Sequence, residues 1–210
     1  MAHKAHPKLL RVGITEEWDS AWFSNKRKYK DILKEDLLIR EYLSKKFGKG
    51  IIEKIKIERS GDKLNIIIRT SKPGVVIGRG GTGVETLAKE ISKKIKNKEI
   101  KIDIEEVKDP SLSASIIAQQ IASDIERRVP FRKVVKRAME RVLQRKGVEG
   151  VKIKVKGRLN GVEIARAETF KQGKLPLQTL RSQIDYAHET ANCTYGVVSV
   201  KVWIYKGEKV

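Results

Sequence analysis

Four glycines within six residues restrict the fold of this chain more than any other feature of it. The run Gly78-Arg79-Gly80-Gly81, followed by Gly83, lies between a short apolar stretch and a segment of helical periodicity. Glycine adopts positive φ without strain and lets a ligand approach the backbone closely, because it has no Cβ. The run therefore predicts a sharp turn into the N-terminus of a helix, where backbone amides can bind phosphate.

Three structures are consistent with this loop. In a KH domain it is the G-x-x-G clamp, which brings backbone amides to the phosphates of about four nucleotides. Val76 and Ile77 would then form an aliphatic wall for the bases, and Arg79 would contact a phosphate. In a dinucleotide-binding fold, the same glycines satisfy G-x-G-x-x-G, with Asp103 further on in a later strand. In the third structure the glycines only cap a helix and form a tight turn.

The segments around the loop favour the KH domain. A helical pattern over 31–47 is followed by two alternating strands joined at Ser60-Gly61-Asp62, then the loop with its helices, and a strand over 99–107. This order is that of a type II KH domain. A dinucleotide loop follows a buried strand directly, whereas Pro73 and a helical stretch intervene here. We therefore expect a KH type II RNA-binding domain over 31–108.

The rest of the chain predicts an arm and a second domain. Residues 1–30 are expected to form an extended N-terminal arm and a short helix that carries Trp18, Trp22 and Phe23. Residues 109–210 are expected to form a basic α/β domain with two helices packed on a four-stranded sheet, and Asn160-Gly161 is the strongest hairpin signal in it. The expected elements are helices over 111–128 and 130–146 and strands over 151–156, 162–170, 178–188 and 195–205. The predicted fold class is α+β.

The second of these helices is strongly cationic on one side. At about 100° per residue the two halves separate: one carries Arg132, Lys133, Lys136, Arg137 and Arg141, and the other carries Val134, Val135, Ala138, Met139 and Val142. A solvated helix surface would interleave acids for i, i+4 pairing, but nine Lys or Arg face only two Glu between Glu126 and Lys146. Phosphate binding is therefore favoured over simple solvation.

The net charge of +20 indicates a polyanionic partner, either nucleic acid or an anionic membrane surface. No window of about 18 apolar residues exists, so we expect no membrane span. A single cysteine, Cys193, allows no disulfide within the chain and suggests the cytoplasm. We read Cys193 as a buried thiol and the nearby His188 as a packed histidine, since no activating partner is evident. We expect no metal, cofactor, small-molecule substrate or catalytic activity.

Nearly the whole chain resembles the bacterial type of the small-subunit ribosomal protein S-three family. The matching stretches are His6-Pro7, Arg11-Val12-Gly13-Ile14, Trp18 to Phe23, Pro73 to Gly78, Glu126-Arg127-Arg128-Val129, Gly157-Arg158-Leu159, Glu163-Ile164-Ala165-Arg166, Leu175-Pro176-Leu177, Thr179-Leu180-Arg181, Thr194-Tyr195-Gly196-Val197 and Lys206-Gly207-Glu208. In one departure, this chain has Arg79-Gly80 where family members often place two lysines between the outer glycines.

The resemblance implies a structural protein in the head of the small ribosomal subunit. Its partners would be ribosomal RNA, mRNA and the tenth and fourteenth small-subunit proteins. The pore through which mRNA enters would be lined by Arg127, Arg128, Arg132, Lys133, Lys136 and Arg137. Further contacts to ribosomal RNA would come from Lys4, His6, Lys8, Arg11, Arg158 and Arg166. The alternative that the residues leave open is a free-standing RNA regulator that uses the KH loop alone.

Overall fold

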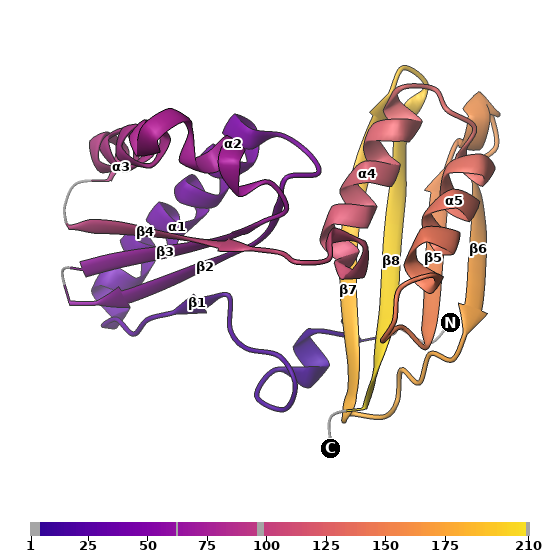
Figure 1. Cartoon of the computed structure of the whole chain (residues 1–210), viewed down its shortest axis with the longest axis horizontal. Coiled ribbons are helices and arrows are strands. Elements are labelled where there is room, and N and C mark those ends of the chain that lie inside the picture. Colours follow the sequence, from indigo (N-terminus) through magenta and orange to yellow (C-terminus); the bar gives the residue numbers. More distant parts are fainter. Residues whose placement is uncertain (1–4, 62, 96–98, 209–210) are drawn as a thin grey trace. The chain divides into compact units, whose positions relative to one another are not determined.

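A computed structural model of the chain describes residues 5–61, 63–95 and 99–208, which divide into two compact units (Figure 1). One unit runs from Trp18 to Lys108. The other combines the chain up to Glu17 with the residues from Asp109 onward. Both units contain helices and a four-stranded sheet, so the predicted α+β class is confirmed.

The unit of residues 18–108 is built on a mixed sheet of order β1-β2-β3-β4, in which only β2 and β3 are antiparallel. Its elements are β1 (Ser20–Ala21), α1 (Lys26–Phe47), β2 (Ile52–Ser60), β3 (Lys63–Thr70), α2 (Pro73–Ile77), the 3-10 turn η2 (Arg79–Gly81), α3 (Thr82–Lys94) and β4 (Ile100–Glu106). From α1 onward this is the element order expected of a type II KH domain.

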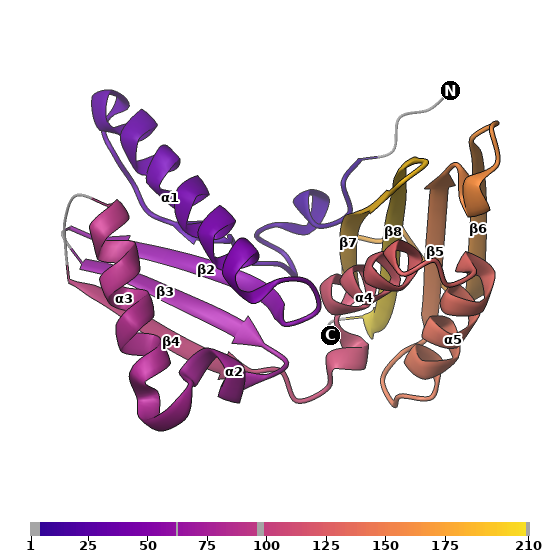
Figure 2. The ribbon, with the colours of Figure 1, turned by 90° about the horizontal axis from the view of Figure 1, so that it is seen from above.

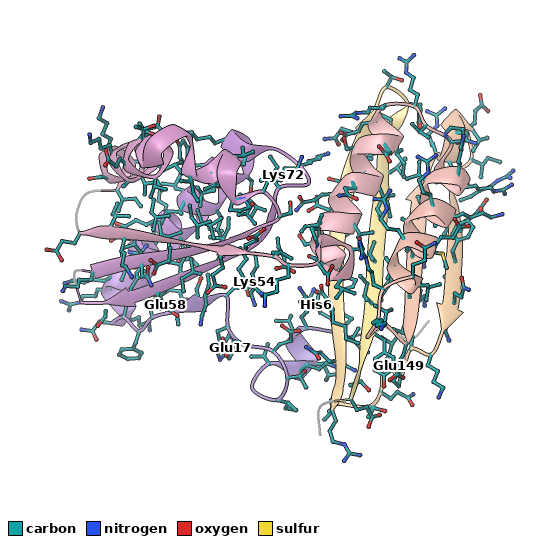
Figure 3. The ribbon with its side chains drawn as sticks, viewed as in Figure 1. His6, Glu17, Lys54, Glu58, Lys72 and Glu149 are labelled. Atoms are coloured by element: carbon teal, nitrogen blue, oxygen red, sulfur yellow. The ribbon has the colours of Figure 1, made fainter. Side chains whose placement is uncertain are left out.

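The core of this unit forms because the sheet is apolar on one face only. Alternate residues such as Ile57 and Ile66 are buried against Leu43 of α1 and Leu87 of α3, so both helices pack on that face (Figure 2). Each such side chain contributes about 1.5–3 kcal/mol by leaving water. The intervening β2 residues, including Lys54, lie on the other face (Figure 3).

No short helix carries Trp18, Trp22 and Phe23, because α1 begins only at Lys26, so that prediction was wrong. Ser20 and Ala21 instead form β1, which pairs in parallel with β2, and the amide of Ile57 donates a hydrogen bond to the carbonyl of Asp19 at 3.0 Å. Trp22 turns toward α1, where its Nε1 donates to Asp36 Oδ2 at 2.8 Å. These contacts with distant residues override the helical spacing of the aromatic residues.

The second unit is a purely antiparallel sheet of order β6-β5-β8-β7, with α4 and α5 on one face (Figure 1). Its elements are η1 (Leu9–Arg11), η3 (Pro110–Leu112), α4 (Ala114–Glu126), α5 (Phe131–Leu143), β5 (Gly150–Gly157), η4 (Leu159–Gly161), β6 (Arg166–Gly173), β7 (Ser182–Cys193) and β8 (Gly196–Glu208). Two helices on a four-stranded sheet were expected and are confirmed.

Asn160-Gly161 does not form the tight hairpin turn that its sequence suggests. Gly157 pairs with Arg166, so the strands join through a longer loop, and the expected strand over 162–170 begins only at Arg166. Asn160 has φ 57° within the turn η4, and Arg158 Nε donates to the carbonyl of Val162 at 2.9 Å. These local bonds hold the segment as a loop.

Candidate nucleic-acid interface

The glycine loop, named here the clamp (Gly78–Gly81), connects α2 to α3 in a conformation that requires glycine. The φ angles of Gly78, Gly80 and Gly81 are 71°, 62° and 81°. This region costs other residues roughly 1–2 kcal/mol. A Cβ placed on Gly80 or Gly81 would meet no atom within 4 Å, so the outer side of the clamp is open. A phosphate can therefore approach the backbone there.

Gly83 has a packing role that the KH interpretation of the sequence missed. A Cβ at this position would lie 2.6 Å from the carbonyl oxygen of Ile77 and 2.8 Å from that of Val76. The first turn of α3 therefore packs directly against the end of α2. The presence of a fourth glycine, one more than the clamp itself contains, was the sequence signal for this close packing. The dinucleotide interpretation is wrong because the loop follows the helix α2 instead of a buried strand.

The residues beside the clamp separate into core and surface. Val76 is only 1 % exposed and belongs to the core, so its predicted place in an RNA-facing wall is wrong. Val75 and Ile77 are exposed on α2 and form the accessible aliphatic surface there. The predicted contacts of the Arg79 side chain, and of Lys4, lie outside the described part of the chain.

Helix α5 is amphipathic as predicted. Val134, Val135, Met139 and Val142 are buried against the sheet. The opposite surface, named here the cationic ridge, is exposed and consists of Arg132, Lys133, Lys136 and Arg137. Arg132 Nη2 pairs with Glu168 Oε1 at 2.7 Å, and this hydrogen bond raises the pKa of Arg132 and lowers that of Glu168. The cation of Arg132 is thus partly neutralised by its partner.

Arg127 and Arg128 lie at the turn that leads from α4 into α5, and both are exposed. Arg128 adopts φ 64°, a left-handed conformation that is uncommon outside glycine. The amides of Arg128 and Val129 donate to the carbonyls of Ile125 and Asp124 at 2.9 Å and 3.1 Å. These bonds fix the turn, so two further cations lie next to the N-terminal end of the ridge.

Arg11 is a structural residue, and its predicted contact with RNA is wrong. The side chain is fully buried. Its guanidinium donates to the carbonyls of Ser182 at 2.8 Å, Pro7 at 3.0 Å, Leu177 at 3.0 Å and Thr179 at 2.9 Å, and to that of Pro176 at 3.5 Å. Burial lowers the pKa of Arg11 from its ordinary value. The residue ties the N-terminal segment to the loop between β6 and β7.

Four other residues predicted to contact RNA occupy different environments. His6 is exposed and packs edge-on against Tyr186, with ring centroids 4.8 Å apart. Lys8 pairs with Asp185 at 2.9 Å. Arg158 donates to the backbone carbonyls of Val162 and Tyr195 in its own domain. Arg166, at the start of β6, is exposed.

His188 and Cys193 are five residues apart on β7, so their side chains point to opposite faces of the sheet. His188 is exposed beside Ser199 Oγ, at 2.8 Å, so the expectation of a packed histidine was wrong. Cys193 is partly buried, with its Sγ 3.9 Å from the carbonyl of Ile125.

Within the described residues, no group of three or more His, Cys, Asp or Glu could hold a metal ion. Among the helices described here, none has the length and apolarity to span a membrane.

The fold and these surfaces define a KH-domain protein with an additional basic α/β domain. Family models agree: the KH domain matches residues 38–112, and "Ribosomal protein S3, C-terminal domain" matches residues 121–204. The chain belongs to the uS3 family of small ribosomal subunit proteins, which confirms the resemblance seen in the sequence.

Relatives in the family match the chain along almost all of its length. The uS3 protein of Caldicellulosiruptor saccharolyticus is 49% identical over 208 residues, which cover 99% of this chain and 93% of that protein. The uS3 protein of Desulforamulus reducens is also 49% identical, with the same coverage of 99% and 93%. The relative of Cyanophora paradoxa, "Small ribosomal subunit protein uS3c", is 46% identical over 100% of this chain and 96% of its own.

Proposed function

We propose that this chain is a non-catalytic constituent of the small ribosomal subunit in the cytoplasm. It binds ribosomal RNA in the head of the subunit and helps to line the pore through which mRNA enters. Relatives of nearly the same length carry the name of a small ribosomal subunit protein, which supports this assignment. The tenth and fourteenth small-subunit proteins are its proposed neighbours.

The two domains have different proposed roles. The KH domain, over 31–108, holds ribosomal RNA through the clamp, whose open glycines let phosphates reach the backbone amides at the start of α3. The C-terminal domain, over 109–210, presents the cationic ridge to mRNA. The charges of both domains attract phosphate without reading sequence, which suits a protein that must accept every message.

The observation that carries the mRNA role is the cationic ridge itself. The ridge belongs to a helix whose other side is packed into the core, so the backbone positions of Lys133, Lys136 and Arg137 are fixed. A fixed row of cations can hold a single strand as it separates from a hairpin. The opening itself is driven by movement of the message through the ribosome, so the protein needs no nucleotide hydrolysis of its own.

The test uses small subunits that carry the triple variant Arg132→Gln, Lys133→Gln, Lys136→Gln. Elongation should slow several-fold on a message with a stable hairpin and stay unchanged on an unstructured message. For the free chain, each lost phosphate contact should reduce the salt slope of single-stranded RNA binding by about 0.7. The lysines should account for most of that loss, because Glu168 already partly neutralises Arg132.

The matched control removes the same number of charges from α1, with Lys28→Gln, Lys30→Gln and Lys34→Gln, which are exposed. Equal elongation of the ridge variant and this control on the hairpin message would refute the mRNA role. A gradient at moderate salt addresses the broader assignment. A chain found wholly outside the small-subunit fraction, with footprints on messengers in place of ribosomal RNA, would support a free-standing regulator.

A further inference from the structure

We propose that the C-terminal domain has a second RNA-binding surface, which takes an unpaired RNA segment on the face of its sheet turned away from α4 and α5. This open sheet face is defined by Lys152, Lys154 and Lys156 of β5 and Lys201 and Trp203 of β8. It lies on the opposite side of the sheet from the cationic ridge, and neither the clamp nor the ridge includes any of these residues.

Strand register places these residues in rows across the sheet. Lys152 pairs with Trp203, which pairs with Tyr186 on the next strand. Lys154 pairs with Lys201 in the row beside it. Directly paired residues of antiparallel strands point to the same face. The buried Val151, Ile153 and Val155 alternate with the three lysines of β5 and turn toward the helices, so all the rows lie on the open sheet face.

Acidic residues of these strands point the other way. Glu168 pairs with Val155 on the core side and binds Arg132 of α5. Asp185 accepts a hydrogen bond from the amide of Ala114 at the start of α4. In the described structure Lys154, Lys156 and Lys201 have no ion-pair partner. The open sheet face therefore holds uncompensated positive charge.

A groove runs along this face, with a volume of about 1290 Å³. The sheet forms its floor, the N-terminal segment from Ala5 to Arg11 forms one part of its wall, and residues 175–179 between β6 and β7 form another. Among the described residues that line it there is no carboxylate. Arg11 binds carbonyls of the 175–179 segment, so it joins these two parts of the wall. The groove is thus preformed.

Aromatic rings lie between the cations. The ring centroids of Trp203 and Tyr186 are 5.2 Å apart. Lys152 Nζ lies 5.2 Å from the centroid of the Trp203 ring, and His6 packs on Tyr186. Trp203 is partly exposed, whereas Tyr186 is buried and supports it. Burial, and next the nearby Lys8 and Lys201, lower the pKa of His6.

This combination fits a single RNA strand better than an acidic protein segment. Alternate residues of a strand are about 6.7 Å apart, so the three lysines of β5 form a regular row that can follow successive phosphates. A partly exposed indole beside that row can stack a base, as in proteins that bind single strands without sequence preference. The groove volume of about 1290 Å³ is comparable to that of a few nucleotides of one strand.

The experiment uses the full-length chain and a short oligouridylate that carries 4-thiouridine. After photocrosslinking, mass spectrometry identifies the attached peptides. Crosslinks should form on β5 and β8, and the sheet variant Lys154→Gln, Lys156→Gln, Lys201→Gln should reduce them at least tenfold. The salt slope should fall by about 2, or about 0.7 for each lost contact. Crosslinks to β5 and β8 should persist in the ridge variant and in the α1 control defined above.

Failure of this inference can be distinguished from failure of the proposed mRNA role, because the ridge variant tests the latter separately. Unchanged crosslinking of the sheet variant, or crosslinks that never reach β5 and β8, would overturn the proposal. A second arm replaces RNA with oligoaspartate. Binding of oligoaspartate at least as tight as that of RNA, with the same dependence on Lys154, Lys156 and Lys201, would identify a site for acidic protein segments instead. Thermal unfolding of each variant checks that the fold is intact.

Discussion

Replacing Arg11 should destabilise the C-terminal domain without weakening a direct contact with RNA. In Arg11→Met the apolar bulk is retained, but the buried carbonyls lose their donor. Four of the hydrogen bonds from the guanidinium are 3.0 Å or shorter. Bonds to a charged group contribute about 1.5–3 kcal/mol each, but they do not add in full because burying the guanidinium is itself costly.

The net loss expected is therefore about 3–5 kcal/mol, because several buried carbonyls lose their donor at about 1–3 kcal/mol each and removal of the buried guanidinium offsets part of that sum. Native-state hydrogen exchange resolves the change by element. Protection of β7 and β8 should fall by this amount, whereas protection of β2 and β3 in the other domain should not change. Arg11→Lys keeps the charge but not the planar fork of donors, so it should recover only part of the loss. A decrease below 1 kcal/mol in β7 and β8 would refute the structural role of Arg11.

Three further predictions concern single residues. Gly83→Ala should destabilise the KH domain by at least 1–3 kcal/mol, since the new Cβ would overlap backbone atoms of α2, and thermal unfolding measures the loss. Asp36→Asn should cost about 1.5–3 kcal/mol in denaturant unfolding, because Asp36 is buried and pairs with Arg59 at 2.6 Å, while Arg59 keeps its second partner Glu35. Burial alone would raise the pKa of Asp185, but Lys8, Lys206 and the amide of Ala114 lower it below its ordinary value. The stability that this carboxylate contributes is therefore present above the unfolded-state pKa and is lost as pH falls through the lower folded-state pKa. Asp185→Asn should consequently make unfolding of the C-terminal domain depend less on acid pH.

Local patterns predicted much of the fold. The period of α5 separates its buried valines from its cations, and both sets lie where the sequence places them. The clamp was also recognisable, because positive φ at three of its positions restricts them to glycine. In both cases the determining interactions lie within one element or one turn. Such features can be read from a short window of sequence.

Features that depend on distant contacts were not predictable in this way. Arg11 looks like a surface cation in an arm, yet its acceptors include Ser182, which is 171 positions away in the sequence. Val76 lies in an apolar run whose neighbours are exposed, and only packing onto the KH core distinguishes it from them. The conformation of the segment around Trp22 is set by contacts with β2 and Asp36, and not by the helical spacing of its aromatic residues.

The open sheet face was missed for a related reason. Lys152, Lys154 and Lys156 alternate with core residues, which is the ordinary pattern of a half-exposed strand. Their association with Lys201 and Trp203 depends on the pairing of β5 with β8, and these strands are far apart in the sequence. The sequence alone gives no sign that the N-terminal segment forms a wall over them.

The central claim is that the clamp and the cationic ridge lie against RNA phosphates in the small subunit. A structure of the small subunit that contains this chain and a bound message tests it most directly. We predict RNA phosphates within hydrogen-bonding distance of the amides around Gly80 and Gly81, and the message within reach of Lys133 and Lys136. If both surfaces faced bulk water, with no nucleotide near them, the claim would be contradicted.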